Sequence, residues 1–470
     1  MAEIPDNFNG YLNIDNDIFV YSITDFIVTL LPAHSSQEKR YDSFLKICLN
    51  NSDPEYLFGE HNNFKIAILR KDKFVTGIAQ PFLPIQFATP LIIKAIGNGS
   101  GFYSRLTNDW NMFDAITFYG GNINSLYRPE LAIEPNDIKE YLNNDGTRKI
   151  KIRPWKEYTQ NVKVKIGNEQ ALLTISISQS GEHINKEYFN SYNLGELNSF
   201  IRLSFYNAQS FEMIEKYYII IRKLIAILTR QNNIYFNVYL SQRGSDNLYY
   251  RTANCKFYEN YVNYSRKNHY NVISFDDVIE YIPNLINKIE NKDIDSILFL
   301  LPEDNTMVNK VSIINIQDIC TALEVSYKWN KRKRIKDNNI ETLKKYIKET
   351  INEFQKNHPK IDIYNQTTIS SAFQYLDYTL KDKILTLYDE NNEIIDKIIS
   401  KWKLPPMTEE NVSSFVKLRN QKTHSSAFNI NNSINLYPAL LALVYICLFK
   451  YIELPDEKIK AIILSVFNQK

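Results

Sequence analysis

The spacing of apolar residues changes near residue 272, and this change most constrains what the chain can fold into. Before it, apolar and polar residues alternate, as they do in strands that bury one face. Val162–Ile166 alternates strictly, and Gly167–Asn168 separates it from a second apolar run, Leu172–Ile177, which predicts a hairpin. Phe64–Leu69 and Phe74–Ile78 flank a short polar turn in the same way. The first part of the chain is therefore predicted to be rich in β-strands.

One helix is predicted within this β-rich part. Apolar residues recur at helical spacing over Phe211–Leu228, which indicates a helix with one face packed on the sheet. Ile234–Leu240 returns to strand spacing. Two glycine-containing stretches, Gly97–Gly101 and Gly120–Gly121, are interpreted as loop and turn, because neither continues into the Gly-Lys-Ser/Thr of a phosphate loop.

Helical spacing dominates beyond residue 272. Ser274 can cap a helix that continues to Asn291, and Asn338 can cap another with apolar residues along one side. A third helix is predicted over Phe373–Leu387. The predicted fold class is thus α+β, with a β-rich domain at residues 1–272 and an all-helical, mostly antiparallel bundle at residues 273–470.

Composition narrows the class of protein. The chain of 470 residues is 44% hydrophobic and 23% charged, as soluble globular proteins are, and it carries a net charge of +2. So small a charge predicts no global attraction to nucleic acid, and any RNA contact would come from local patches. The four cysteines are scattered and no histidine stands at metal-ligand spacing. We therefore expect reduced core cysteines, no metal and no cofactor.

Two segments bear on localisation. The acidic N-terminus, Met1–Asp6, lacks the apolar core of a secretory signal. The longest apolar run, Leu436–Phe449, contains Pro438 and is shorter than the ~20 residues that a membrane span needs. We expect a buried helix there, no membrane association and a cytoplasmic protein.

The segment most suggestive of chemistry is Val416–His424. It places Arg419 and Asn420 five and four residues before His424, at the end of a helix that Thr408 can cap. On an unbroken helix the Arg419 and His424 side chains would point about 140° apart. For both to face one ligand, the helix is expected to loosen near Lys422.

This segment resembles the C-terminal end of the Apea-like HEPN family of prokaryotic proteins, in which an Arg-Asn, three residues and a His precede a loop and two closing apolar helices. A looser likeness extends to Thr321–Glu324 and to Ile116–Gly121. The resemblance implies a HEPN helical bundle, a site assembled across a homodimer or higher homo-oligomer, and a role in anti-phage abortive infection. It also implies cleavage of cellular RNA, with tRNA as one candidate, and a sensor or regulatory N-terminal domain that responds to a phage-derived trigger.

The motif contains the groups that metal-independent RNA cleavage needs. A histidine such as His424 can take or give a proton near neutral pH, and the Arg419 guanidinium matches phosphate oxygens. Asn420 could orient either of them. Attack by the 2′-hydroxyl would leave 2′,3′-cyclic phosphate ends, so the predicted activity is that of an endoribonuclease. Glu324 and Lys422 are candidate supporting residues.

Other interpretations of these residues stay open. His424 could stabilise the C-terminus of the helix while Arg419 pairs with a surface carboxylate. The chain would then be a non-catalytic HEPN-type scaffold that binds RNA or a partner protein. The two hypotheses differ in turnover, because only the enzyme should produce cyclic-phosphate ends that depend on His424.

A basic run follows the predicted helix that carries Glu324. It is the densest in the chain and contains an aromatic residue, so it could track an RNA backbone and stack a base. The alternative is a solvated linker between helices. Its weak RNA-binding candidates are Lys328, Trp329, Lys331, Arg332, Lys333 and Arg334.

Overall fold

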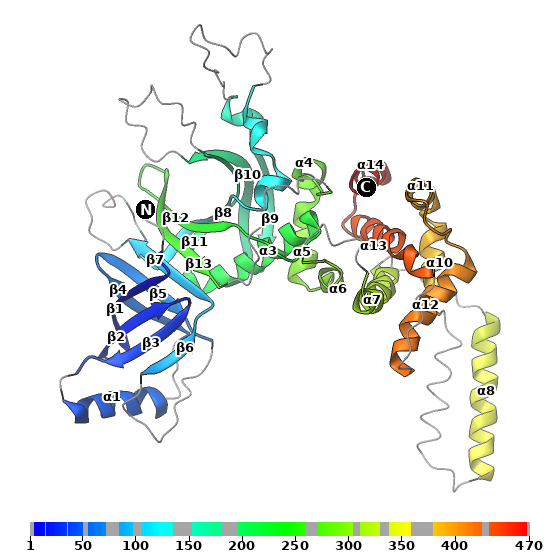
Figure 1. The fold of residues 1–470 in the computed structure, drawn as a ribbon, viewed down its shortest axis with the longest axis horizontal. Helices are drawn as coiled ribbons and strands as arrows, with labels where there is room; N and C mark the ends of the chain where they lie inside the picture. The colour runs from blue at the N-terminus through cyan, green and yellow to red at the C-terminus, as the bar shows by residue number, and fades with distance from the viewer. Residues whose placement is uncertain are drawn as a thin grey trace. The chain divides into compact units, whose positions relative to one another are not determined.

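The structure of the protein, a computed structural model, describes the chain over these ranges: 4–14, 16–34, 36–49, 55–71, 84–96, 106, 108–134, 153–180, 196–258, 271–303, 311–329, 338–358, 379–424 and 432–467. The fold class is α+β, as predicted, with a sheet in the first part of the chain and helices in the second (Figure 1).

The chain forms two compact units. The first comprises Met1–Ile225 with Asn233–Tyr264, and the second comprises Ala226–Asn232 with Ser265–Lys470. Residues 226–232 thus join the helical unit, which the apolar spacing did not indicate. Within that unit the Tyr445 hydroxyl donates to the Ile227 carbonyl at 3.2 Å. A boundary near residue 272 stays a prediction, because residues 259–270 lie outside the described ranges.

The described strands of the first unit form one antiparallel sheet of thirteen strands, in the order β6-β3-β2-β1-β4-β5-β7-β13-β12-β8-β11-β10-β9. Their bounds are β1 Asn7–Ile14, β2 Asp17–Thr24, β3 Ile27–Pro32, β4 Tyr56–His61, β5 Phe64–Leu69, β6 Ile85–Ala88, β7 Leu91–Ile96, β8 Met112–Tyr119, β9 Gln160–Ile166, β10 Glu169–Ser180, β11 Glu196–Ser210, β12 Asn237–Arg243 and β13 Tyr249–Phe257. The short helices of this unit are α1 Gln37–Leu49, α2 Ile123–Leu126, η2 Pro129–Ala132, η4 Trp155–Tyr158 and η6 Phe211–Met213.

Of the two predicted hairpins, the structure describes one in full and the other only in part. β9 and β10 pair through Ile166 and Glu169, and Gly167 has the positive φ of 61° that a tight turn between strands requires. β5 forms as predicted and pairs with β4 and β7, whereas its predicted partner Phe74–Ile78 and the Gly97–Gly101 loop lie outside the described residues. The predicted strand at Ile234–Leu240 begins three residues later, at β12.

Gly120 and Gly121 form the predicted turn, with φ angles of 72° and 54°. A Cβ atom on Gly121 would lie 2.0 Å from the Tyr235 carbonyl oxygen, so only glycine fits where the backbones approach. The turn ends β8, whose neighbours in the sheet are β11 and β12.

Helix α3, Ile214–Thr229, covers the apolar face of the sheet and confirms the predicted packed helix. The ring of Tyr217 on α3 lies 4.6 Å from the Phe205 ring on β11 and 6.4 Å from the Phe113 ring on β8. All three side chains are fully buried. A second cluster of buried residues, including Phe19 and Ile66, forms the core between strands β1–β7.

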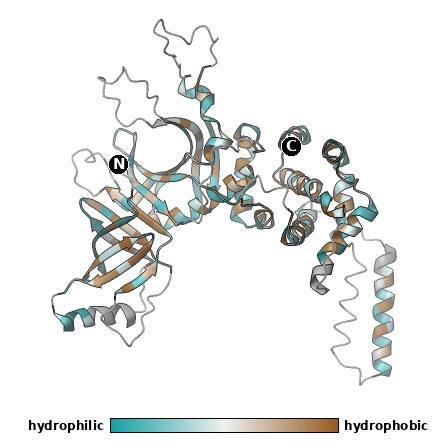
Figure 2. Ribbon diagram, viewed as in Figure 1, coloured by the Kyte–Doolittle hydropathy of each residue, from teal (hydrophilic) through white to brown (hydrophobic). Residues whose placement is uncertain are grey.

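The second unit is helical. Its helices are α4 Phe275–Val278, η7 Ile279–Tyr281, α5 Ile282–Glu290, α6 Asp295–Leu298, α7 Ile313–Trp329, α8 Asn338–Asn357, α10 Leu380–Asp389, α11 Asn392–Trp402, α12 Glu409–His424, η10 Asn432–Leu436, α13 Tyr437–Tyr451 and α14 Asp456–Val466. α13 contacts α7, α11 and α14, and most of its residues are buried. Figure 2 shows its apolar character.

α13 also bears on membrane association. Together with η10 it gives 19 helical residues, Ser433–Tyr451, long and apolar enough to cross a membrane. The sequence predicted an apolar run too short to span a membrane, whereas the helix is long enough, so length alone does not exclude a membrane span. However, 78% of its most apolar window is buried inside the helical unit, which is typical of the core helix of a soluble protein.

Two predicted helices differ in their limits. Ser274 caps the first as predicted, since its hydroxyl accepts the Asp276 N–H at 3.3 Å, but the segment is divided into α4, η7 and α5. α10 begins only at Leu380, because Thr379 is extended and caps it; residues 359–378 lie outside the described ranges. A helix running unbroken through Thr379 was therefore a wrong prediction.

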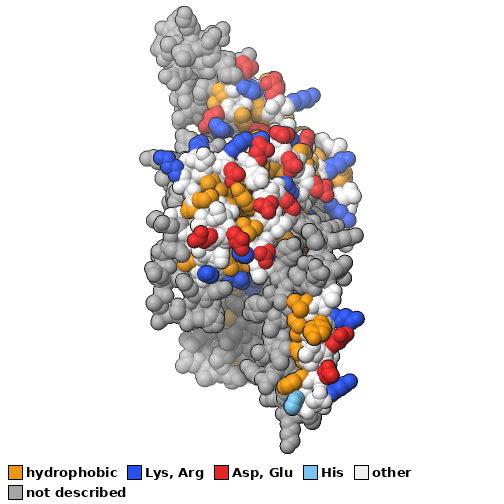
Figure 3. Space-filling model, turned by 90° about the vertical axis from the view of Figure 1, so that its right-hand side faces the viewer, with side chains coloured by type: hydrophobic (Ala, Val, Ile, Leu, Met, Phe, Trp, Pro, Cys, Tyr) orange, Lys and Arg blue, Asp and Glu red, His pale blue; other side chains and the backbone are white. Residues whose placement is uncertain are grey.

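Helix α8 leaves much of its apolar side exposed. Leu343, Tyr346 and Phe354 are 46%, 68% and 54% exposed, and Figure 3 shows a line of hydrophobic side chains along this helix. The apolar spacing predicted the helix itself. The spacing did not indicate that the apolar side of α8 would be left exposed by the residues that the structure describes around it.

Candidate functional site

The Arg419 motif lies on α12. Thr408 caps this helix as predicted, with its hydroxyl accepting the Asn411 N–H at 3.3 Å. Glu409 and Glu410 lie in the first turn, where carboxylates stabilise the positive end of the helix dipole. Val412, Phe415 and Leu418 are buried at helical spacing and hold the inner face of α12 in the unit.

The helix does not loosen at Lys422. α12 runs through His424, because the sequence Glu409–His424 contains no glycine or proline to interrupt it. The Arg419 and His424 positions are therefore about 140° apart around the helix axis. The expectation that the motif opens into a loop before His424 was wrong, and one copy of α12 does not by itself direct both residues to one point.

Arg419 meets Glu324 across two helices. Its Nη1 atom lies 3.7 Å from Oε1 of Glu324 on α7, and α7 and α12 pack against each other. The side chains are 34% and 33% exposed, so solvent reaches both groups. Screening by that solvent limits the pair to about 1 kcal/mol of stability or less. Arg419 therefore keeps most of its capacity to bind an anion.

The ion pair lies close to a buried thiol. Cys320 is one turn before Glu324 on α7 and is fully buried. The pKa of this thiol is raised to about 12, chiefly by burial; the Arg419 guanidinium lowers it and the Glu324 carboxylate raises it, both to a smaller extent. The thiol is neutral at physiological pH, so it is not a nucleophile for this site.

The remaining candidates on α12 are described only in part. Asn420, Lys422 and His424 occupy the last turns of the helix, and their side chains lie outside the described part of the structure. The structure thus shows the juxtaposition of two candidate residues, Arg419 and Glu324. That of Arg419 with His424 stays a prediction.

The basic run contributes less than the sequence indicated. The Trp329 ring stacks on Tyr451 with centroids 5.0 Å apart, and its Nε1 donates to the Asp293 carbonyl at 3.2 Å. It is only 9% exposed, which corrects the prediction that this ring could stack an RNA base. Lys328 is exposed, whereas Lys331, Arg332, Lys333 and Arg334 lie outside the described residues.

Sequence reasoning missed one pocket in the helical unit. It has a volume of about 600 Å³ and is lined by Val311, Trp402, Lys403, Leu404, Ile434, Asn435 and Pro438. Its lining residues come from three separated segments, so no local pattern could have indicated it. Within the described ranges, no group of three or more His, Cys, Asp or Glu side chains is placed to hold a metal ion.

With this geometry in place, we compared the chain with known proteins. Family models, curated proteins and solved structures give no match. Chemically, the arrangement offers a guanidinium at a solvent-accessible helix surface, a carboxylate that orients it, and a histidine position five residues further along the same helix.

Proposed function

We propose that the chain is a metal-independent endoribonuclease of the HEPN type that acts in the cytoplasm in anti-phage defence by abortive infection. The observation that carries the proposal is the partly exposed Arg419, oriented by Glu324 and followed by Asn420 and His424 on α12. A guanidinium held at a surface but not buried suits transient contact with a phosphate.

The proposed reaction uses the RNA's own nucleophile. A histidine takes the proton of the 2′-hydroxyl, the 2′ oxygen bonds to the adjacent phosphorus, and the bond to the 5′ oxygen breaks as that oxygen gains a proton. The products are a 2′,3′-cyclic phosphate and a 5′-hydroxyl. Arg419 would stabilise the charge that develops on the phosphorane, with Asn420 orienting either group.

The unbroken α12 favours a site shared between two copies of the chain. Because the positions of Arg419 and His424 are about 140° apart around the axis of one helix, a two-fold arrangement can bring Arg419 of one chain to His424 of another. A two-fold dimer of this kind has two such sites, each with Arg419 of one chain and His424 of the other. We infer a homodimer or higher homo-oligomer formed through the helical unit.

The sheet-containing unit is proposed to regulate the nuclease. A cell that carries an enzyme against its own RNA must keep it inactive, and a phage-derived trigger sensed by the first unit would release it. Cellular RNA, with tRNA as one candidate, is the proposed substrate.

The test is RNA cleavage in EDTA. Wild-type chain, Arg419→Ala, His424→Ala and the control Lys417→Ala, which changes an exposed residue on the same helix, are incubated with tRNA and with a long single-stranded RNA. We expect cyclic-phosphate ends from wild type and the control, and a loss of about 100-fold or more in each motif variant. Equal cleavage by His424→Ala would exclude the proposed site.

The ion pair itself favours a second candidate function. A guanidinium paired with Glu324 could serve packing between α7 and α12 alone, in a non-catalytic scaffold that binds RNA or a protein. Growth on expression separates the two, since only the nuclease should slow growth. The scaffold predicts that wild type and the Arg419→Ala, His424→Ala double variant are equally harmless.

A further inference from the structure

One face of the sheet is polar across six adjacent strands, from β9 to β13 through β10, β11, β8 and β12. A single row of directly paired residues crosses it: Asn161, Thr174, Arg202, Thr117, Tyr239 and Asn254. Each of these side chains can donate or accept a hydrogen bond. A polar row of this length is not needed for a sheet to fold.

The adjacent row, on the opposite face, is entirely apolar. It consists of Val162, Leu173, Leu203, Ile116, Leu240 and Ala253, paired in the same order. Successive residues of a strand point to opposite faces, so the apolar row lies on the side where α3 packs. The polar face is therefore turned away from the core formed with α3.

Three arginines and three tyrosines interleave on the polar face, and we call this group the arginine–tyrosine face: Arg202, Arg243, Arg251, Tyr119, Tyr239 and Tyr249. The Arg251 guanidinium lies 4.6 Å from the Tyr239 ring centre and 5.9 Å from that of Tyr119, and these two rings are 5.4 Å apart. Contacts with aromatic rings restrict the orientation of a guanidinium group. Nucleobases stack on aromatic rings and on guanidinium planes, so both kinds of side chain on this face can contact a base.

The other two arginines meet at one tyrosine. The Arg202 and Arg243 guanidinium carbons lie 5.7 Å and 5.3 Å from the Tyr249 ring centre, and Arg243 Nη2 donates to the Tyr249 hydroxyl at 2.8 Å. Arg202 Nη2 also donates to the Tyr239 hydroxyl at 3.4 Å, which joins these residues to Arg251 and Tyr119. The six side chains therefore form one connected array over β8, β11, β12 and β13, which lie side by side in the sheet (Figure 1).

The array carries positive charge without a matching negative one. No ion pair joins Arg202, Arg243 or Arg251 to a carboxylate within the described part of the chain. The pKa of Arg243 is raised chiefly by its hydrogen bond with Tyr249; Asp114, whose carboxylate accepts the backbone N–H of Arg243 at 2.7 Å, adds only a minor effect. All six side chains are partly exposed. Three accessible cations in one array are complementary to a polyanion.

Further stacking and cationic groups extend the same face. The Trp155 ring stacks on Phe200 with centroids 5.9 Å apart, and Phe200 lies beneath the Arg202 guanidinium. Trp155 is 47% exposed, so one side of its ring is open. Lys163, two residues from the polar row on β9, is exposed and belongs to the same face by register.

We propose that the arginine–tyrosine face binds a single-stranded nucleic acid, with the arginines on phosphates and the rings of Trp155 and the tyrosines on bases. Single strands expose both groups at once, whereas a duplex hides its base faces. The proposal is independent of the ribonuclease activity, since it concerns binding by the first unit and not cleavage by α12.

The test measures binding without cleavage. The full-length chain carrying Arg419→Ala and His424→Ala is titrated against a fluorescent single-stranded RNA of about 20 nucleotides, enough to span a site of ~4–16 nucleotides. Adding Arg202→Gln and Arg251→Gln should weaken binding about tenfold or more and reduce the slope of log K against log salt by about 1.4.

The control has the same change of charge at another place in the unit. Lys39→Gln with Lys65→Gln removes two positive charges from α1 and from the opposite face of the sheet, and should leave affinity within about twofold. Trp155→Ala, a single change at a half-exposed ring, should weaken binding about fivefold or more without altering the salt slope. Thermal unfolding confirms that each variant is folded.

A single-stranded DNA of the same sequence is the second arm. Equal affinity for both supports recognition of phosphates and bases alone, and tighter binding of RNA supports a contact with the 2′-hydroxyl as well. Absence of binding to both strands, or equal loss of affinity in the face variant and the control, would overturn the proposal and leave the proposed nuclease untouched.

Discussion

At the scale of single residues, the contact between Arg419 and Glu324 decides how the motif is understood. The two side chains lie 3.7 Å apart at a partly exposed surface. An ion pair of this kind adds little to stability, but it is close enough to orient the guanidinium. Glu324 would then be a positioning residue, acting through Arg419 rather than on RNA.

Glu324→Gln should therefore lower kcat/KM for RNA cleavage about tenfold, less than the loss of about 100-fold or more expected for Arg419→Ala. The thermal midpoint should change little, because the pair is solvent-screened. Glu409→Gln is the matched control, since Glu409, on the helix that carries Arg419, makes an exposed ion pair with Lys381. A large loss of stability with unchanged kcat/KM would instead assign the pair to packing.

The Cys320 thiol gives a pH dependence of stability. Its pKa rises from 9.0 to about 12 on folding, chiefly because it is buried. Between those values the folded chain keeps a proton that the unfolded chain loses. Stability from this thiol is therefore complete below about pH 9 and decreases as pH rises toward 12.

The comparison is between wild type and Cys320→Ala in urea, from about pH 7 to about pH 10.5. Wild type should be the more stable at neutral pH, because alanine leaves a small cavity. Above pH 9 this advantage should shrink by roughly 1 kcal/mol for each pH unit. An advantage that stays constant over the whole range would show that the thiol titrates normally in the folded chain.

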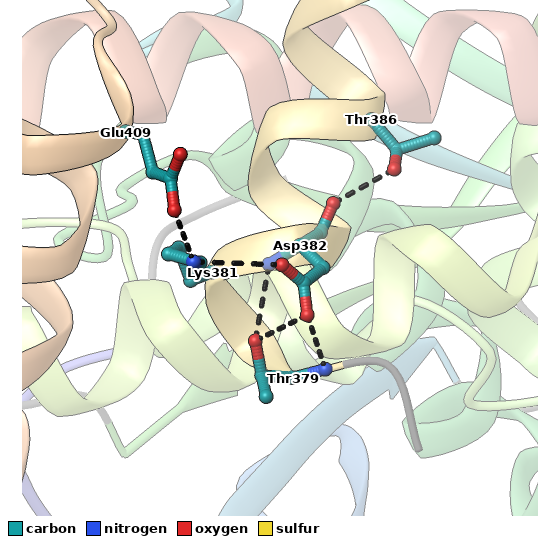
Figure 4. Close-up of polar contacts among 5 residues, drawn as sticks. All are labelled: Thr379, Lys381, Asp382, Thr386 and Glu409. Atoms are coloured by element: carbon teal, nitrogen blue, oxygen red, sulfur yellow. Dashed lines mark hydrogen bonds and ion pairs between the residues drawn. The ribbon is translucent and has the colours of Figure 1, made fainter. Parts of the chain in front are cut away.

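At the scale of elements, the start of α10 shows how a local signal limits a helix. The Thr379 hydroxyl accepts the Asp382 N–H at 3.3 Å, and the Asp382 carboxylate accepts the Thr379 N–H at 2.9 Å (Figure 4). Lys381 then joins this helix end to Glu409 at the start of α12, with Nζ 2.6 Å from Oε1. The capping box thus sets where α10 begins, and Lys381 links that helix end to the first turn of α12.

Thr379→Ala should lower the free energy of unfolding by about 1 kcal/mol, because the Asp382 backbone N–H loses the hydroxyl that accepts its hydrogen bond. Urea denaturation measures the change. The control is Thr386→Ala on the same helix, whose hydroxyl only donates back to the Asp382 carbonyl at 2.7 Å. Its loss should stay within about 0.5 kcal/mol. Equal effects of the two substitutions would contradict a capping role.

At the scale of the whole molecule, the continuous α12 makes the proposed active site depend on a second chain. If Arg419 of one subunit serves His424 of the other, mixing two inactive variants restores one complete site in each mixed dimer. If both groups of a site come from one chain, mixing restores nothing.

Arg419→Ala and His424→Ala proteins, unfolded together and refolded at equal concentration, should therefore recover about a quarter of wild-type cleavage, because half of the dimers are mixed and each has one complete site of two. Each variant refolded alone should stay inactive. The absence of recovery in a mixture that is dimeric by light scattering would exclude the shared site.

Much of the local structure was predictable from neighbouring residues. Strict alternation predicted the β9–β10 hairpin, Thr408 predicted the start of α12, and an apolar run predicted the buried α13. Each depends on contacts between residues a few positions apart, which a period of two or 3.6 already specifies. The absence of glycine and proline in α12 was equally readable, and it contradicts the expected loosening at Lys422.

The sequence by itself therefore determined the class of each segment: strands, then helices, with an Arg-Asn and a His near the end of one of them. Only the tertiary structure decided that Glu324 reaches Arg419, that Trp329 is buried against Tyr451, and that six strands align their polar residues in one row. These contacts join residues far apart in the chain. Their partners are set by which elements pack together, and no local pattern carries that information.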